Sequence, residues 1–226
     1  MTGTSPFIGA GQFGKNAAIY LKKFLFNTNA MLEVLEESYS FGGRGIELIP
    51  LGKISKAAKI MKETHNDYII TGSTFPGPDP LIKELINLDA TIIFVHGMIS
   101  DRKNYNLFKV LDEIAACGVI PGIAAHNPIS TLKFAFENTE AKTFLIPFNA
   151  NGMLMGNQKE LEDLIDNNHD NYFVGMKPLA AGRLDPQKAF DYIVQHNICS
   201  TTIGMVSREE AKTSTKIALN AFEKRS

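Results

Sequence analysis

The sequence predicts a single eight-stranded parallel (β/α)8 barrel, the TIM-barrel fold, over residues 1–226. Two observations predict it: eight short apolar runs occur along the chain, and each is followed by a helix-like stretch. The runs are apolar throughout rather than alternating, as expected of parallel strands buried on both faces. Parallel neighbours need a helical crossover, and eight such units close into a barrel of typically about 250 residues.

The predicted strands follow one another along the whole chain. They are Ser5–Gly11, Gly45–Pro50, Tyr68–Ser73, Thr91–His96, Val119–Ala124, Thr143–Phe148, Tyr172–Lys177 and Cys199–Gly204. Because barrel enzymes work at the C-terminal ends of the strands, the residues that end each run are the first candidates for function.

Capping signals mark the predicted helices. Ser207 and Glu210 have capping-box spacing, Asp79-Pro80 and Asp185-Pro186 place an acceptor before a proline, and Gly118 is placed to end a helix. The helices are predicted at Ala30–Phe41, Ser55–Thr64, Leu81–Leu88, Asp101–Cys117, Ile129–Asn138, Lys159–Asn167, Gln187–His196 and from Ser207 onward.

The longest strand-to-helix connection is predicted at Gln12–Asn29, overhanging the C-terminal end of the barrel as a loop or short helix. Its part Ala17–Phe26 has the pattern of an amphipathic helix. We interpret the segment as a lid or as a subunit contact that would make the protein a homo-oligomer. The alternative is a direct contact of Tyr20 with substrate.

Composition limits the partners and the compartment. The net charge is −1 and no basic block stands out, which argues against nucleic acid and anionic membrane as partners. No signal peptide or long apolar span is recognisable, so a soluble cytoplasmic protein with a small-molecule substrate is expected. Cys117 and Cys199 match no metal-binding spacing and are predicted to be buried thiols.

Two histidines and an asparagine end neighbouring strands. His96 ends the fourth run and His126-Asn127 the fifth, so both imidazoles are expected at the barrel mouth, where they could orient a carbonyl or move a proton. A shared metal, with Glu47 as a third ligand, and a structural role for His96 stay open as alternatives. Asn149 ends the sixth run, either to bind a ligand or to form a turn.

The remaining candidate site residues are Lys177 and the start of the helix predicted from Ser207. Lys177 ends the seventh run and could form a Schiff base, contact a phosphate or be an ordinary paired lysine. Ala180–Gly182 allows the backbone to approach a ligand closely. After the eighth run, Ser207 and Arg208 begin a helix whose free amides could bind an anion, with an ordinary capped helix as the alternative.

These residues resemble the aldo-keto reductase superfamily. Gly118–Asn127 is similar to its fifth strand, Gly175–Leu184 to its seventh strand and following Pro-Leu-x-x-Gly loop, and Thr202–Glu210 to its eighth strand and nucleotide-phosphate helix. Ile92–His96 resembles the fourth strand with the active-site histidine, and Ser5–Gly14 resembles the first strand more loosely.

The resemblance implies an NADP site at the barrel mouth. Its roles would fall to Asn127 for the carboxamide, Gly182 with Arg183 beside it for the pyrophosphate, and Ser207 with Arg208 for the 2′-phosphate. His96 would orient a substrate carbonyl. Apart from the resemblance, their places at strand ends make His126 and Lys177 candidate catalytic residues and Asn149 a candidate cofactor-binding residue.

Other positions depart from the family pattern. Pro50 stands where the family's aspartate would fall, no tyrosine follows before Tyr68, and Gly72 or Ser73 replaces its lysine. The family's serine has become His126, its glutamine falls near Leu145, and the aromatic that would stack on nicotinamide falls at Met176.

Three hypotheses therefore remain after the sequence. One is an oxidoreductase that keeps a nicotinamide site but uses other acids. The second is a lyase or isomerase that acts on a phosphorylated metabolite. The third is a non-catalytic, ligand-binding barrel. Fold alone does not choose among them, because this barrel hosts many chemistries.

Overall fold

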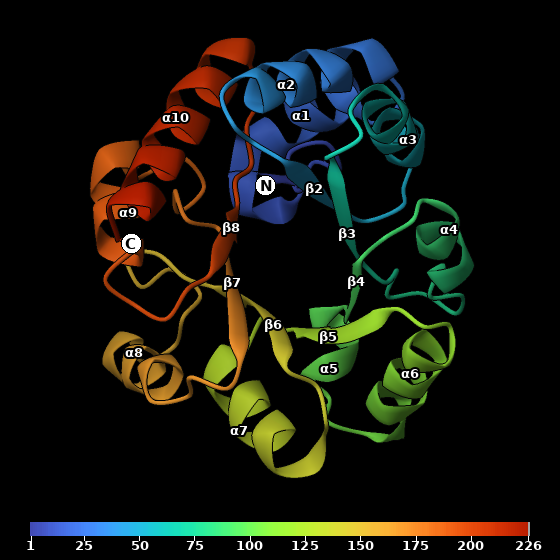
Figure 1. Cartoon of the computed structure of the whole chain (residues 1–226), viewed down its shortest axis with the longest axis vertical. Helices are drawn as coiled ribbons and strands as arrows, with labels where there is room; N and C mark the ends of the chain where they lie inside the picture. The colour runs from blue at the N-terminus through green and yellow to red at the C-terminus, as the bar shows by residue number, and fades with distance from the viewer. Residues whose placement is uncertain (226) are drawn as a thin grey trace.

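The computed structural model describes residues 1–225 and confirms the predicted barrel (Figure 1). One parallel sheet runs in the order β1 to β8, and successive strands in the sequence are neighbours throughout. The strands are β1 Thr2–Gly3, β2 Gly45–Leu48, β3 Ile69–Ser73, β4 Ile92–Val95, β5 Ile120–Ala124, β6 Thr143–Pro147, β7 Tyr172–Met176 and β8 Ser200–Thr202.

The barrel closes between its first and last strands. Thr2 and Ile203 form a parallel bridge, the amide of Gly3 donates to the carbonyl of Ile203 (2.9 Å), and the amide of Ile203 donates to the carbonyl of Met1 (2.9 Å). The strand ends therefore form a continuous ring, and the side chains that follow β2, β4, β5 and β7 can converge on one opening.

Helices form the outer ring (Figure 1). They are α1 Ala17–Phe24, α2 Thr28–Ser40, α3 Ile54–Thr64, α4 Ile82–Asn87, α5 Gly97–Ser100, α6 Tyr105–Ala116, α7 Pro128–Asn138, α8 Gln158–Asp166, α9 Pro186–Ile193 and α10 Arg208–Arg225, with the 3-10 helix η1 at Gly11–Asn16. The main core lies between these helices and the sheet. A second cluster fills the barrel interior: Phe94, Ala124, Leu145 and Val174.

The predicted first strand was wrong. Ser5–Gly11 contains a compact turn instead, because Phe7 and Ile8 both donate their amides to the carbonyl of Thr4 (2.9 and 3.3 Å). The strand is the two-residue β1 just before it. Phe7 made the segment look like a strand because it is fully buried, against Phe24 at 4.7 Å between ring centroids.

Two further predictions are corrected. The helix predicted from Asp101 begins at Tyr105, because Asn104 accepts from the amide of Asn106 and caps it, while Gly97–Ser100 forms a separate short helix. The cysteines are exposed rather than buried, although the Cys199 thiol still donates to the carbonyl of Phe173 (3.1 Å).

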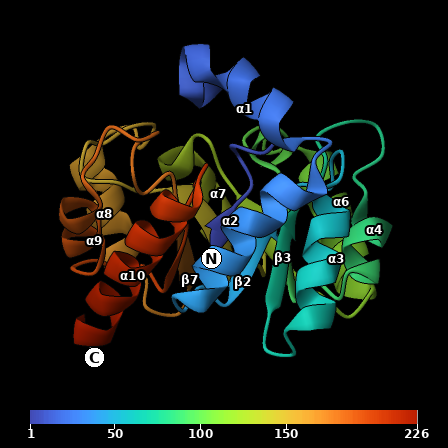
Figure 2. The ribbon, with the colours of Figure 1, turned by 90° about the horizontal axis from the view of Figure 1, so that it is seen from above.

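Residues 12–29 rise from the C-terminal end of the barrel, where α1 projects beyond the other helices (Figure 2). Lys53, after β2, donates its amide to the carbonyl of Leu25, and Lys23 donates Nζ to the carbonyl of Val206 (2.7 Å), after β8. The loops that follow two different strands therefore hold this segment in place. Ile19 and Phe26 stay exposed.

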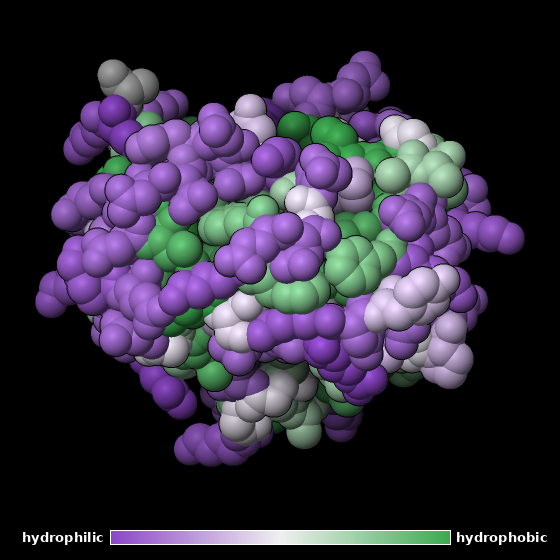
Figure 3. Space-filling model, turned by 90° about the horizontal axis from the view of Figure 1, so that it is seen from below, coloured by the Kyte–Doolittle hydropathy of each residue, from purple (hydrophilic) through white to green (hydrophobic). Residues whose placement is uncertain are grey.

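The face shown in Figure 3 is mostly hydrophilic, with apolar residues gathered near its middle. No helix within residues 1–225 is both long enough and apolar enough to cross a membrane. The homo-oligomer stays a prediction, because nothing in the structure shows what covers any part of this surface.

Candidate active site

A small pocket opens at the C-terminal ends of the strands, which we call the barrel mouth. It lies between the loops after β7 and β8 and the segment around η1. Its lining combines charged, polar and backbone surface: Gly3, Ser5, Gln12, Phe13, Glu47, Met176, Lys177, Pro178, Leu179, Ala181, Gly182, Thr202 and Gly204. A mixed lining with a few charged groups is typical of small-molecule sites.

Glu47 is the buried carboxylate of this pocket. It lies on β2, paired with Gly3 and Thr71, and is only 8% exposed. Ser73 on β3 donates Oγ to its Oε1 (2.7 Å). Burial raises its pKa to about 7, against the opposing effects of the Ser73 hydrogen bond and the Lys177 charge. Glu47 can therefore hold or release a proton near neutral pH.

Lys177 follows β7 and faces the same pocket. Its Nζ lies 3.2 Å from the Met176 sulfur, and among residues 1–225 no carboxylate oxygen lies within the 4.0 Å of an ion pair. Burial lowers its pKa to about 8, and Glu47 and Asp101 partly oppose this shift. The structure therefore excludes the ordinary paired surface lysine that the sequence left open.

His96 lies at the end of β4 as the cap of α5. Its Nδ1 accepts from the amide of Met98 (3.1 Å), so the neutral ring carries its proton on Nε2. Burial lowers its pKa to about 4, with His126 and Lys177 adding to the shift. At neutral pH His96 is thus an uncharged hydrogen-bond donor.

His126 packs against His96 with the ring centroids 5.2 Å apart, edge to face. Burial lowers its pKa, and the Lys177 charge adds to the shift while Asp101 opposes it. Asp101 also fixes its position, because Oδ2 accepts from the backbone amides of His126 and Asn127 (3.1 Å each). Within residues 1–225, no group of three or more His, Cys, Asp or Glu side chains is placed to hold a metal ion.

Sequence reasoning missed two of these groups. Glu47 was considered only as a metal ligand, although one charged residue inside an apolar strand is a signal in itself. Asp101 was hidden inside a predicted helix. It instead caps α7 from another segment, with Thr131 donating Oγ1 to its Oδ1 (2.8 Å).

The predicted cofactor residues divide into two groups. Asn149 is fully buried, and its amide side chain both donates to the carbonyl and accepts from the amide of Met153, so it forms a turn. Ser207 accepts from the amide of Glu210 (3.2 Å), the capping bond expected from the sequence. The amide group of Asn149 is therefore already engaged, whereas the Ser207 hydroxyl accepts one bond and keeps its proton to donate.

Asn127, Gly182, Arg183 and Arg208 are more accessible. Asn127 makes no capping bond with its side chain, and a Cβ at Gly182 would meet nothing within 4 Å. Arg183 donates Nη1 toward the Met153 sulfur (3.9 Å), while the Arg208 side chain is 65% exposed and its Nε lies 4.0 Å from Glu33.

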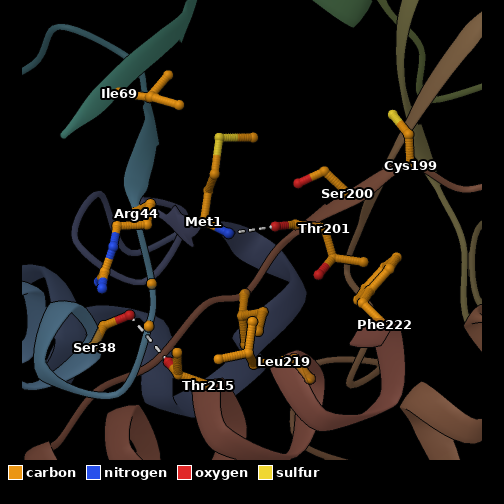
Figure 4. A pocket seen from close by; sticks show the side chains of 14 residues that line it. Met1, Ser38, Arg44, Ile69, Cys199, Ser200, Thr201, Thr215, Leu219 and Phe222 are labelled. Carbon is orange, nitrogen blue, oxygen red and sulfur yellow. Dashed lines mark hydrogen bonds between the residues drawn. The ribbon is translucent and has the colours of Figure 1, made fainter. Parts of the chain in front are cut away.

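A separate cavity lies at the opposite, N-terminal end of the barrel, between β8, α2 and the end of α10 (Figure 4). Its lining is largely apolar, and Met1 and Leu219 point into it. The titratable groups described above are not part of it, and the N-terminal face of a barrel usually serves stability.

Comparison with solved structures places the fold among aldo-keto reductases. An aldo-keto reductase from Pseudomonas aeruginosa is similar at TM-score 0.67 and 12% identity, over 86% of this chain and 84% of that one. A point mutant of Gox0644 in complex with NADPH is similar at TM-score 0.65 and 12% identity, over 89% and 87%. Aldo-keto reductase AKR11C1 from Bacillus halodurans gives 0.63 and 12%, over 89% of each chain.

These structures show the fold alone, since their sequences are so different. No protein-family model matches the sequence, and no curated protein matches it. The resemblance noted from the motifs thus agrees with the fold, while the residues at the mouth must carry any argument about activity.

Proposed function

We propose that the protein is an NADP-dependent oxidoreductase that reduces a small aldehyde or ketone at the barrel mouth. The observation that supports it most is the convergence of Glu47, His96 and Lys177, all with pKa values moved by burial, on one end of the barrel. A structure with this fold binds NADPH, which supports the choice of cofactor.

The residues present fit a nicotinamide dinucleotide in part. Gly182 offers open backbone for the pyrophosphate, Arg208 offers an exposed guanidinium with a long contact to Glu33, and Asn127 offers a side chain that makes no capping bond. Asn149 is committed elsewhere, and Met176 stands where an aromatic ring would stack. The fit is therefore better at the phosphate end than at the nicotinamide end.

The chain's own residues would supply orientation and protons. His96 donates a hydrogen bond from Nε2 to the substrate carbonyl, and the Lys177 ammonium stabilises the negative charge that develops on that oxygen. Protonated Glu47 takes the place of the missing tyrosine as the proton source. A bound NADPH would supply the hydride.

Arg208→Ala tests the cofactor site. We expect NADPH to bind about 1–3 kcal/mol more weakly, because one charge-assisted hydrogen bond to phosphate is lost. The measurement is a titration of purified protein that follows cofactor fluorescence. Lys216→Ala, which removes a positive charge from the same helix at an exposed position, is the matched control and should bind normally. Equal affinity in all three proteins would remove Arg208 from the site, and no binding by the wild type would overturn the cofactor assignment.

A further inference from the structure

The loop after β7 holds Lys177 in a conformation that most residues avoid. Lys177, Ala180 and Ala181 have φ values of 59°, 47° and 58°, in the left-handed region. Such residues persist only where the surroundings over-determine them, and they cluster at functional sites. Here the carbonyl of Lys177 accepts from the amide of Ala180 (2.9 Å) and the carbonyl of Leu179 accepts from Gly182 (2.9 Å).

This loop presents an amine that forms no ion pair with a carboxylate of residues 1–225. The contact recorded for Nζ is the weakly accepting Met176 sulfur. The amine shares its pocket with Glu47, and its charge also acts on His96 and His126. An amine with a proton acceptor and a proton donor around it is the arrangement that imine chemistry requires.

The remaining polar groups of the pocket indicate the kind of ligand. Ser5, Gln12 and Thr202 line it, and among residues 1–225 their side chains have no hydrogen-bond partner. Thr202 is only 5% exposed and lies on the wall of this pocket, so a ligand there would be within reach of its hydroxyl. Such groups suit the hydroxyls of a small ligand better than an apolar one.

We propose that Lys177 forms an imine with a small hydroxylated aldehyde or ketone bound in this pocket. The neutral Nζ attacks the carbonyl carbon, the C=O π bond opens, and one of the two Nζ protons passes to the carbonyl oxygen, which gives a neutral carbinolamine. Protonated Glu47 then gives its proton to the hydroxyl, the C–O bond breaks to release water, and the nitrogen lone pair forms the C=N bond of a protonated imine beside the Glu47 carboxylate. The step consumes no oxidant or reductant. It rests on the site of the proposed function but not on its cofactor.

Borohydride trapping tests the proposal. The full chain is incubated with hydroxyacetone and sodium borohydride, and the product is analysed by intact mass and peptide mapping. We expect one reduced hydroxyacetone unit per chain, at Lys177, with a yield that is highest between about pH 7 and 8, because attack needs the neutral amine of Lys177 and loss of water needs protonated Glu47.

Lys177→Met should lose the adduct, and Lys177→Arg provides a second variant that keeps the charge if the methionine protein does not fold. Lys56→Met, at an exposed position on α3, is the matched control and should trap normally. Adducts spread over surface lysines, or an unchanged yield in both Lys177 variants, would overturn the proposal.

NADPH titration and borohydride trapping of the same protein distinguish the imine proposal from the oxidoreductase proposal. NADPH binding without a Lys177 adduct would overturn the imine and leave the oxidoreductase standing. An adduct without NADPH binding would overturn the oxidoreductase and favour a lyase that works through the lysine.

Discussion

Glu47→Gln is expected to remove a pH dependence of about 3 kcal/mol from the free energy of unfolding. The folded pKa of Glu47 is about 7 against an ordinary 4.5, so the folded state keeps a proton that the unfolded chain has released. The stability that this group contributes is therefore fully present below pH 4.5 and is lost as the pH rises through about 7. Glutamine cannot titrate, so the variant gains on the wild type across this window.

Urea unfolding followed by circular dichroism at pH 5, 6 and 7 measures the difference between the two proteins. The lowered pKa of His96 acts in the opposite direction, adding stability as the pH rises from 4 to 6.5, but it does so in both proteins and cancels. Glu63→Gln, at an exposed position on α3, is the control and should run parallel to the wild type. Parallel curves for Glu47→Gln as well would mean that Glu47 is ionised throughout this range.

Much of the fold was predictable because it depends on local pattern. A strand buried on both faces needs a continuous apolar run, and the runs at β2 to β8 were found within a few residues of their ends. The first strand was missed because β1 has only two residues, too few to form a pattern. The apolar residues after it serve the core from a turn, which local pattern does not distinguish from a strand.

The candidate site was predictable only where one residue's place along a strand sufficed. His96 and Lys177 end apolar runs, so the barrel rule placed them at the mouth. The proton affinity of Glu47 depends on Ser73, which the register of β2 with β3 brings beside it. Asn149 is unavailable to a cofactor because its side chain forms two hydrogen bonds with the backbone of Met153. Contacts of this kind form only in the folded chain, and no residue spacing in the sequence indicates them.

His96→Gln is expected to lower the rate of NADPH-dependent carbonyl reduction by about 10²–10⁴-fold, the usual contribution of a positioned acid–base group. The Nδ1 bond from Met98 fixes Nε2–H as the donor to the substrate, and the low pKa keeps the ring neutral. Glutamine is similar to histidine in size and can form hydrogen bonds, but its amide does not place a donor where Nε2–H of His96 lies. Steady-state assays with a panel of small aldehydes and ketones measure the loss, and the NADPH affinity should stay nearly unchanged.

A second measurement distinguishes this role from a structural one. In the wild type, the ring proton signals of His96 in an NMR titration should not move between pH 5 and 8, because the pKa of about 4 lies below this range. His169→Gln, at an exposed position away from the mouth, is the control and should retain both activity and stability. Two results together would make His96 a structural cap of α5: His96→Gln unfolds the protein, and the wild type reduces no carbonyl compound. Those results would overturn the reductase and leave a lyase if Lys177 still forms an imine, or a binding protein if it does not.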